Sequence, residues 1–198
     1  IAGAALSVVV AVLSAYAFSR LRFKFRDKLF LLFVLTLVLP QEVLAVPLFI
    51  MINSWGWNDT YGALIIPFAF TAFGTFLMRQ FFLTIPIEYE EAALIDGASR
   101  LRTLWSVLLP QLVAPLSVLA VFSFIGYWNS YLWPLIIINT QDMATVPLGL
   151  GMFTGQFGTQ WSLLMAASTL AVIPSLILVL LLQRQLIKGV TLGGLGGR

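Results

Sequence analysis

Long apolar runs separated by short polar segments are the main pattern along this chain. Five runs are each about 18 residues or longer, the length that a helix needs to cross the hydrocarbon core of a bilayer. They occupy residues 1–18, 29–52, 61–78, 107–127 and 162–183. The pattern predicts an all-α membrane protein, a polytopic helical bundle that forms one transmembrane domain over residues 1–198.

Composition strengthens this prediction and excludes several kinds of chemistry. Hydrophobic residues make up 60% of the 198 positions and charged residues 10%, with a mean hydropathy of +0.99. A soluble domain has roughly 45–50% apolar and about 25% charged residues. The chain has no cysteine and no histidine, which excludes disulfides, Cys/His metal sites and histidine catalysis. We therefore expect no catalytic residue, no metal site and, at a net charge of only +3, no nucleic-acid partner.

The basic residues predict the orientation of the helices. All eleven fall in three groups: residues 20–28 after the first run, residues 79–102 between the third and fourth runs, and residues 184–198 after the fifth. Lys and Arg concentrate in cytoplasmic loops, so alternate loops are predicted to be cytoplasmic. The C-terminus is then inside and Ile1 outside. The sequence opens at Ile1 inside an apolar run, with no charged segment typical of a cleavable signal, so we expect an earlier span to precede it.

Small residues in the first run predict close helix packing. Gly3, Ser7, Ala11 and Ala15 recur at four-residue spacing, which lets two helices approach closely inside a membrane. Alanines that simply face lipid are the alternative. Prolines inside the runs favour a packed, kinked bundle, because each one frees backbone groups that need partners.

The segment 128–161 is expected on the outer side. Its apolar part, 135–138, is too short to cross and is predicted to be a re-entrant or interfacial half-helix. The following residues, 139–161, are rich in Gly, Thr and Gln and are expected to form a long external loop.

The cytoplasmic loop 79–106 contains four of the eight acidic residues. Thr84 and Pro86 suit a helix start, and glutamates in a first turn are favoured by the helix dipole. Gly97 can end the helix in a left-handed conformation. This predicts a short exposed helix that docks into a partner, although a solvated connector would have the same composition.

The order of residues in this loop resembles a known motif. Glu91-Ala92-Ala93, three residues, Gly97, nine residues and then Val107-Leu108-Leu109-Pro110 is similar to the EAA loop of ABC-importer permeases, with valine in place of isoleucine. In that family the loop is a coupling helix seated in the ATP-hydrolysing subunit. The resemblance implies a type I importer permease with ATPase-coupling residues Glu91, Ala92, Ala93, Asp96, Gly97, Leu109 and Pro110.

Other segments resemble the carbohydrate branch of the same family. Residues 15–20 (AYAFSR) with Phe23, the segment 40–47, the segment 81–86 and the segment 128–135 all look like family signatures. Residues 188–194 are similar to the end of the second permease subunit of maltose-type importers, which implies an ATPase-contact tail with Lys188, Gly189, Thr191 and Gly193. Residues 195–198 depart from the usual ending. Family members usually have six spans, so the first one is expected to be missing here.

Two groups of polar residues are candidates for the solute path. Gln41 and Glu42 lie near the middle of the second run, where a carboxylate is costly and normally faces a cavity or a partner. A structural hydrogen bond between helices is an equal alternative. Residues that combine aromatic faces with amide or hydroxyl groups could contact a sugar, or could form an interfacial aromatic belt. They are Trp128, Asn129, Tyr131 and Trp133.

The resemblance also implies partners and a function. A solute-binding protein outside the membrane is expected to dock on the external loop, with Asp142, Gly151, Gln156 and Gly158 as candidate contacts. A second permease, two ATPase subunits that bind ATP and Mg, and the lipid of a bacterial inner membrane complete the assembly. The chain is thus predicted to import a di- or oligosaccharide by alternating access. Alternatives are another solute such as glycerol-3-phosphate, an intramembrane enzyme, and a membrane scaffold that transports nothing.

Overall fold

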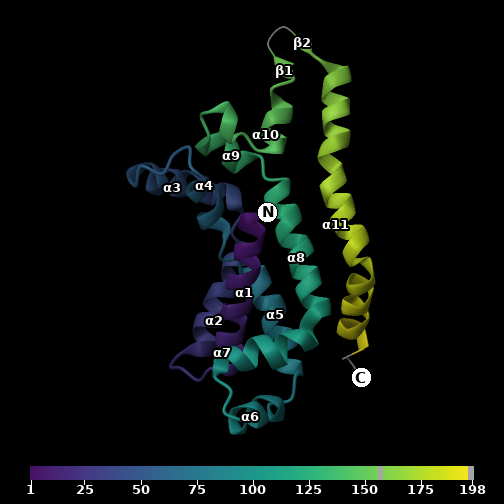
Figure 1. Ribbon diagram of the computed structural model, residues 1–198. Helices are drawn as coiled ribbons and strands as arrows, with labels where there is room; N and C mark the ends of the chain where they lie inside the picture. The colour runs from purple at the N-terminus through teal and green to yellow at the C-terminus, as the bar shows by residue number, and fades with distance from the viewer. Residues whose placement is uncertain (156–157, 196–198) are drawn as a thin grey trace.

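The structure is a computed structural model that describes residues 1–155 and 158–195, with side chains described up to residue 185. It is almost entirely helical, as expected (Figure 1). The helices are α1 (Ala2–Arg20), α2 (Arg26–Leu35), η1 (Thr36–Val38), α3 (Gln41–Ser54), α4 (Tyr61–Ile65), η2 (Ile66–Phe68), α5 (Ala72–Thr84), α6 (Glu88–Ile95), α7 (Arg100–Thr103), η3 (Leu104–Leu108), η4 (Leu109–Leu112), α8 (Val113–Trp128), α9 (Leu132–Ile137), η5 (Gln141–Met143), α10 (Val146–Gly151) and α11 (Trp161–Leu195). Two short strands, β1 (Thr154–Gly155) and β2 (Gly158–Thr159), form an antiparallel pair.

Three helices in the described part of the chain are long and apolar enough to cross a membrane: α1, the continuous helix from Arg100 to Trp128, and α11 as far as Gln185. The number rises to five if each of two bent pairs counts as one span. One pair joins the helices on either side of Pro40 at 104°, and the other joins the α4–η2 segment to α5 at 46°. The second predicted run is therefore sharply broken, because Pro40 disfavours helical geometry at the residue before it and Leu39 is extended.

The core forms where α1 packs against α5 and α8. The side chains of Ser7, Ala11 and Ala15 are buried, and a methyl group added at Gly3 would overlap the ring of Tyr127. Small residues thus let the helix axes approach closely. The stripe faces protein, and the lipid-facing alternative is wrong for this helix.

The two ends of the molecule differ. Figure 1 shows α6 at one end, together with the start of α2, and α9, α10 and the β-hairpin at the other. The segment 139–161 is more ordered than the expected loop, since it contains η5, α10 and the hairpin. The predicted half-helix lies slightly earlier than expected, in α9, where Trp133, Pro134 and Ile137 are buried. The Trp133 indole N–H donates to the carbonyl of Ala63 at 2.9 Å, which attaches α9 to α4.

Candidate functional site

The short helix α6 is the first candidate site, and its sequence explains its two ends. Glu88, Glu90 and Glu91 occupy the first turn, where the helix dipole favours negative charge. Gly97 follows the last turn with φ +79, the left-handed backbone expected of it. The prediction for Thr84 was wrong: it is the last residue of α5, and its hydroxyl donates to the carbonyl of Phe81.

The chain turns back into the bundle immediately after Gly97. The hydroxyl of Ser99 caps α7 by accepting the N–H of Arg102. The helix then widens to a π-helix in η3 and tightens to a 3₁₀-helix in η4. Pro110 has no N–H to continue the regular pattern, and Gln111 instead donates its amide to the carbonyl of Val107 at 2.9 Å. The Leu109-Pro110 part of the motif is thus the point where the helix changes geometry.

An open groove lies beside α6. It has a volume of about 450 Å³ and is lined by Glu88, Tyr89, Ala92, Ala93, Asp96 and Val107. Glu91 and Ala92 are exposed, whereas Ala93 is only 9% exposed. In the second half of the motif Leu109 is buried and Pro110 is exposed. The small alanine side chains leave room for another surface to approach this helix closely.

Glu90 occupies a different position from its neighbours, because it is buried and faces the bundle. Its carboxylate forms an ion pair with Arg20, at 2.8 Å from Oε1 to Nε. Only 10% of the Glu90 side chain and 8% of the Arg20 side chain are exposed. Burial raises the pKa of Glu90, and the guanidinium groups of Arg20 and Arg100 act against that rise.

Arg20 has further partners at the end of α5. Its Nη2 donates to the carbonyls of Phe82 and Ile85, at 2.7 and 2.6 Å. Carbonyls in the last turn of a helix have no partner inside the helix, so a cation placed there satisfies them. Neither Arg20 nor Glu90 was singled out from the sequence.

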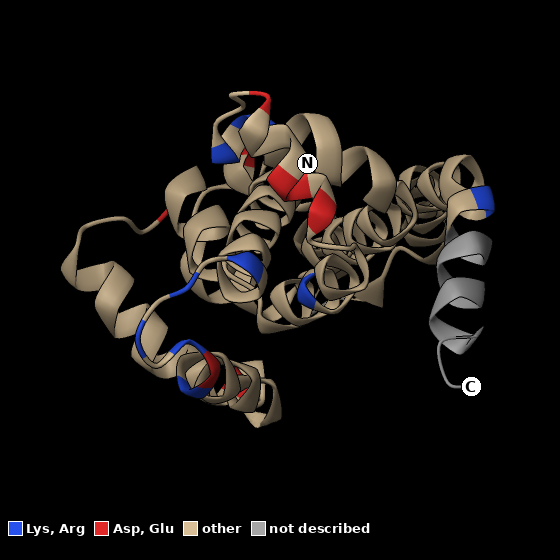
Figure 2. Cartoon of the chain, turned by 90° about the horizontal axis from the view of Figure 1, so that it is seen from below, with Lys and Arg blue, Asp and Glu red and all other residues tan. Residues whose placement is uncertain are grey.

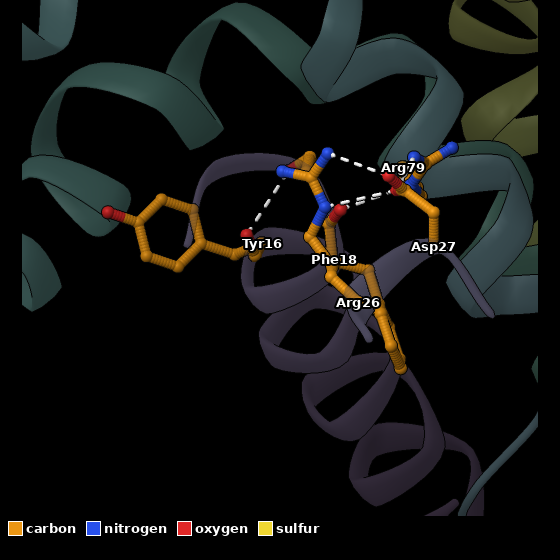
Figure 3. A network of polar contacts seen from close by, with 6 residues as sticks. Tyr16, Phe18, Arg26, Asp27 and Arg79 are labelled. Carbon is orange, nitrogen blue, oxygen red and sulfur yellow. Dashed lines mark hydrogen bonds and ion pairs between the residues drawn. The ribbon is translucent and has the colours of Figure 1, made fainter. Parts of the chain in front are cut away.

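A second arginine connects the same two helices in the other direction, from α5 to α1. Arg79 of α5 donates from Nε to the carbonyl of Phe18 in α1 at 3.2 Å and lies 3.4 Å from the carboxylate of Asp27 (Figure 3). Its guanidinium also lies over the ring of Phe30, 4.1 Å from the centroid. Viewed from this end of the molecule, basic positions are visible on several elements (Figure 2).

A cavity of about 690 Å³ is the second candidate site. Gln41 and Glu42 line it from the first turn of α3, after the break at Pro40, and so lie at a helix start instead of in the middle of a continuous span. Tyr131 and Trp133 line it as well. Six further residues that carry hydroxyl groups line it: Ser7, Thr36, Thr71, Ser123, Tyr127 and Ser130.

The structure does not bring the other two aromatic-segment candidates into this cavity. Trp128 donates its indole N–H to the carbonyl of Ala171 in α11 at 2.9 Å and stacks on Phe124. It therefore attaches α8 to α11. Asn129 ends α8 and is exposed, outside the residues that line the cavity.

The remaining candidates lie at the end of the molecule opposite α6 or beyond the described residues (Figure 1). Asp142 is exposed in η5, Gly151 ends α10, and Gly158 begins β2 with φ +123. Gln156 lies outside the described residues, as do the side chains of the tail candidates. Those candidates are Lys188, Gly189, Thr191 and Gly193.

Comparison with known proteins gives a consistent result. Residues 7–192 match the model of a family described as binding-protein-dependent transport system inner membrane component. The chain is 42% identical over 184 residues to the sn-glycerol-3-phosphate transport system permease protein UgpE of Yersinia pestis, and 41% identical to those of Pectobacterium atrosepticum and Escherichia coli. Each alignment covers 92% of this chain and 66% of the relative, so the chain spans slightly less than two thirds of their length.

A solved structure has the same fold. It is the crystal structure of a bacterial ABC transporter involved in the import of the acidic polysaccharide alginate, with a TM-score of 0.81 and 24% identity. The match covers 92% of this chain and 69% of that chain. This similarity shows the helical permease fold.

Proposed function

Because this chain belongs to the family of binding-protein-dependent transport system inner membrane components, we propose that it is a permease subunit of an ATP-driven importer. It forms half of the solute path and works by alternating access. The chain itself is not catalytic in this proposal. Two partner ATPase subunits bind ATP and Mg, a second permease completes the channel, and a solute-binding protein delivers the solute from outside.

The geometry of α6 carries this proposal. The Glu91-Ala92-Ala93 motif lies on a short helix at one end of the bundle, with Glu91 and Ala92 exposed beside an open groove. Arg20, Arg79 and Arg100 lie close to this end, and basic residues mark the cytoplasmic side. A cytoplasmic ATPase that binds α6 could therefore push on the bundle. The C-terminus is cytoplasmic in the same orientation, in the inner membrane of a bacterium.

The cavity supports a polyhydroxylated solute. Its described lining combines hydroxyl groups with the amide of Gln41 and the rings of Tyr131 and Trp133, and Glu42 is its one acidic or basic residue. Hydroxyl and amide groups bond sugar hydroxyls, and aromatic rings pack on sugar faces. A di- or oligosaccharide is the solute we propose on these grounds.

The relatives favour a second candidate, sn-glycerol-3-phosphate, which the three UgpE proteins are named for. A phosphate calls for cationic groups, and the described lining of this cavity contributes none. In this case the partner permease has to provide them.

Uptake by the reconstituted importer tests both parts. The complex in proteoliposomes is given labelled maltose, maltotriose or sn-glycerol-3-phosphate, and calorimetry shows which of them the binding protein retains. Replacing Glu91 or Gly97 should abolish ATP-dependent uptake while the protein stays in the membrane. Normal uptake by both variants would refute the coupling role of α6.

A further inference from the structure

The inner ends of α1 and α5 meet in an arrangement that is unfavourable without added charge. Both helices end at the same side of the bundle, since Arg20 of α1 reaches the last carbonyls of α5 and Arg79 of α5 reaches a last-turn carbonyl of α1. Two helix C-termini side by side bring two partial negative charges together. The reciprocal arginines neutralise both, so the two helices are fastened to each other in both directions.

Glu90 adds α6 to this pair of helices. It is the one acidic residue of the first turn of α6 that is buried, and its neighbour on the same face, Ala93, is buried too. A buried carboxylate needs an opposite charge, and Arg20 provides it at 2.8 Å. The guanidinium of Arg20 therefore connects three helices: it belongs to α1, donates to carbonyls at the end of α5 and pairs with Glu90 of α6.

The ion pair connects α6 to α1, and no short stretch of backbone links these two helices. Helix α6 follows α5 after only three residues, 85–87, so a movement of α6 reaches α5 through the chain. Helix α1 is distant in sequence and joins α6 through the Arg20–Glu90 pair. Both α1 and α5 carry residues that line the cavity, Ser7 and Phe73 among them.

We propose that Arg20 and Glu90 are positioning residues that fasten α6 to α1, so that α1, α5 and α6 move as one body when an ATPase displaces α6. The proposal rests on the proposed function of this chain as a permease. In it Glu91, on the exposed face, meets the ATPase, and Glu90 passes the displacement on to the helix that lines the cavity. The pair stays closed throughout the transport cycle.

A structural measurement tests the pair without any reference to transport. The variants Glu90→Gln and Arg20→Gln each remove one charge, and Arg22→Gln is the matched control, because Arg22 is an exposed arginine two residues beyond Arg20. Hydrogen–deuterium exchange of the complex should show the amides of 88–95 exchanging at least about tenfold faster in the first two variants, as expected for local opening. Equal exchange in all three variants would overturn the pairing.

Coupling is measured in the same proteoliposomes as uptake per ATP hydrolysed, with whichever of labelled maltose, maltotriose and sn-glycerol-3-phosphate the unmodified complex takes up. Glu90→Gln and Arg20→Gln should lower this ratio about tenfold, a usual size for coupling between two sites, while ATP hydrolysis continues. Arg22→Gln should leave the ratio unchanged. A normal ratio in Glu90→Gln and Arg20→Gln would overturn the proposal. An unmodified complex that takes up none of the three probes would instead count against the proposed function.

A covalent substitute separates transmission from folding. The chain has no cysteine, so Arg20→Cys combined with Glu90→Cys gives a single pair that a short bismaleimide can join. Before cross-linking, the double variant should hydrolyse ATP without coupled uptake. Cross-linking should restore uptake per ATP to within about twofold of the unmodified complex. A cross-linked protein that hydrolyses ATP but does not transport would show that the pair has to open, and would overturn the proposal.

Discussion

A methyl group added at Gly74 tests whether close approach of α1 and α5 holds the bundle together. The new carbon of Gly74→Ala would lie 2.7 Å from Oγ1 of Thr71, 2.8 Å from Cδ1 of Leu119 and 2.9 Å from Cβ of Ala11. Carbon atoms normally pack at about 3.5–4.0 Å. The tip of Leu119 can rotate away, but the Cβ of Ala11 moves only with the backbone of α1. The helices therefore have to separate.

The expected cost follows from two opposing terms. Overpacking of a close-packed core costs about 1–3 kcal/mol. Replacing glycine by alanine inside a helix offsets this by about 0.5–1 kcal/mol. A net loss of about 1–2 kcal/mol corresponds to a melting temperature lower by about 2–8 °C for a chain of this size.

The assay is thermal unfolding of the purified complex in detergent, followed by tryptophan fluorescence. Gly126→Ala is the matched control, because Gly126 also lies in a bundle helix and a methyl group there would meet nothing within 4 Å. The control should unfold at the same temperature or slightly higher. If Gly74→Ala and Gly126→Ala behave alike, the contact between α1 and α5 is not a close one and the reasoning fails.

Three further changes test the end of the molecule that contains α9 and the end of α6. The backbone N–H of Asn139 lowers the pKa of Asp59 below its ordinary 3.8, so this carboxylate stabilises the fold above that pH and ceases to do so as the pH falls through the lowered pKa. Hydrogen-exchange protection of the Asn139 amide should therefore fall at acidic pH, and in Asp59→Asn it should show no such step. Trp133→Phe leaves the buried carbonyl of Ala63 without its donor and should cost about 1–3 kcal/mol in a melting experiment, whereas an unchanged melting temperature would contradict that bond. Gly97→Ala should cost about 1–2 kcal/mol through its left-handed backbone alone, and Gly97→Asn less, when both are compared by melting.

Features set by local sequence were predictable. Close packing of α1 could be predicted from the four-residue repeat of its small residues alone. The burial of Ser7, Ala11 and Ala15 agrees with that prediction. The left-handed backbone of Gly97 followed from a glycine placed after a short predicted helix. The helical fold class followed from composition and the length of the apolar runs.

Features that depend on contacts between distant residues were not predictable. Pro40 marked a break in the second run, but the size of the bend, 104°, is not contained in the local sequence. Trp128 and Trp133 belong to one aromatic segment, yet one bonds to α11 and the other lines the cavity. Which of several glutamates in a loop is buried depends on where the end of α1 lies, and no pattern within the loop contains that information.

The two sides of α6 place its acidic residues in different surroundings, since Glu90 is buried whereas Glu88 and Glu91 are exposed. A helix of 8 residues has about two turns, enough for one exposed face and one buried face. It is attached by the short link to α5, the turn at Gly97, its packing against α7 and η3, and the ion pair of Glu90. A single residue inserted before Glu90 would rotate Glu90 by about 100° around the helix axis and away from Arg20. The buried position of Glu90, three residues before the buried Ala93, is therefore what the proposed fastening of α6 to α1 requires.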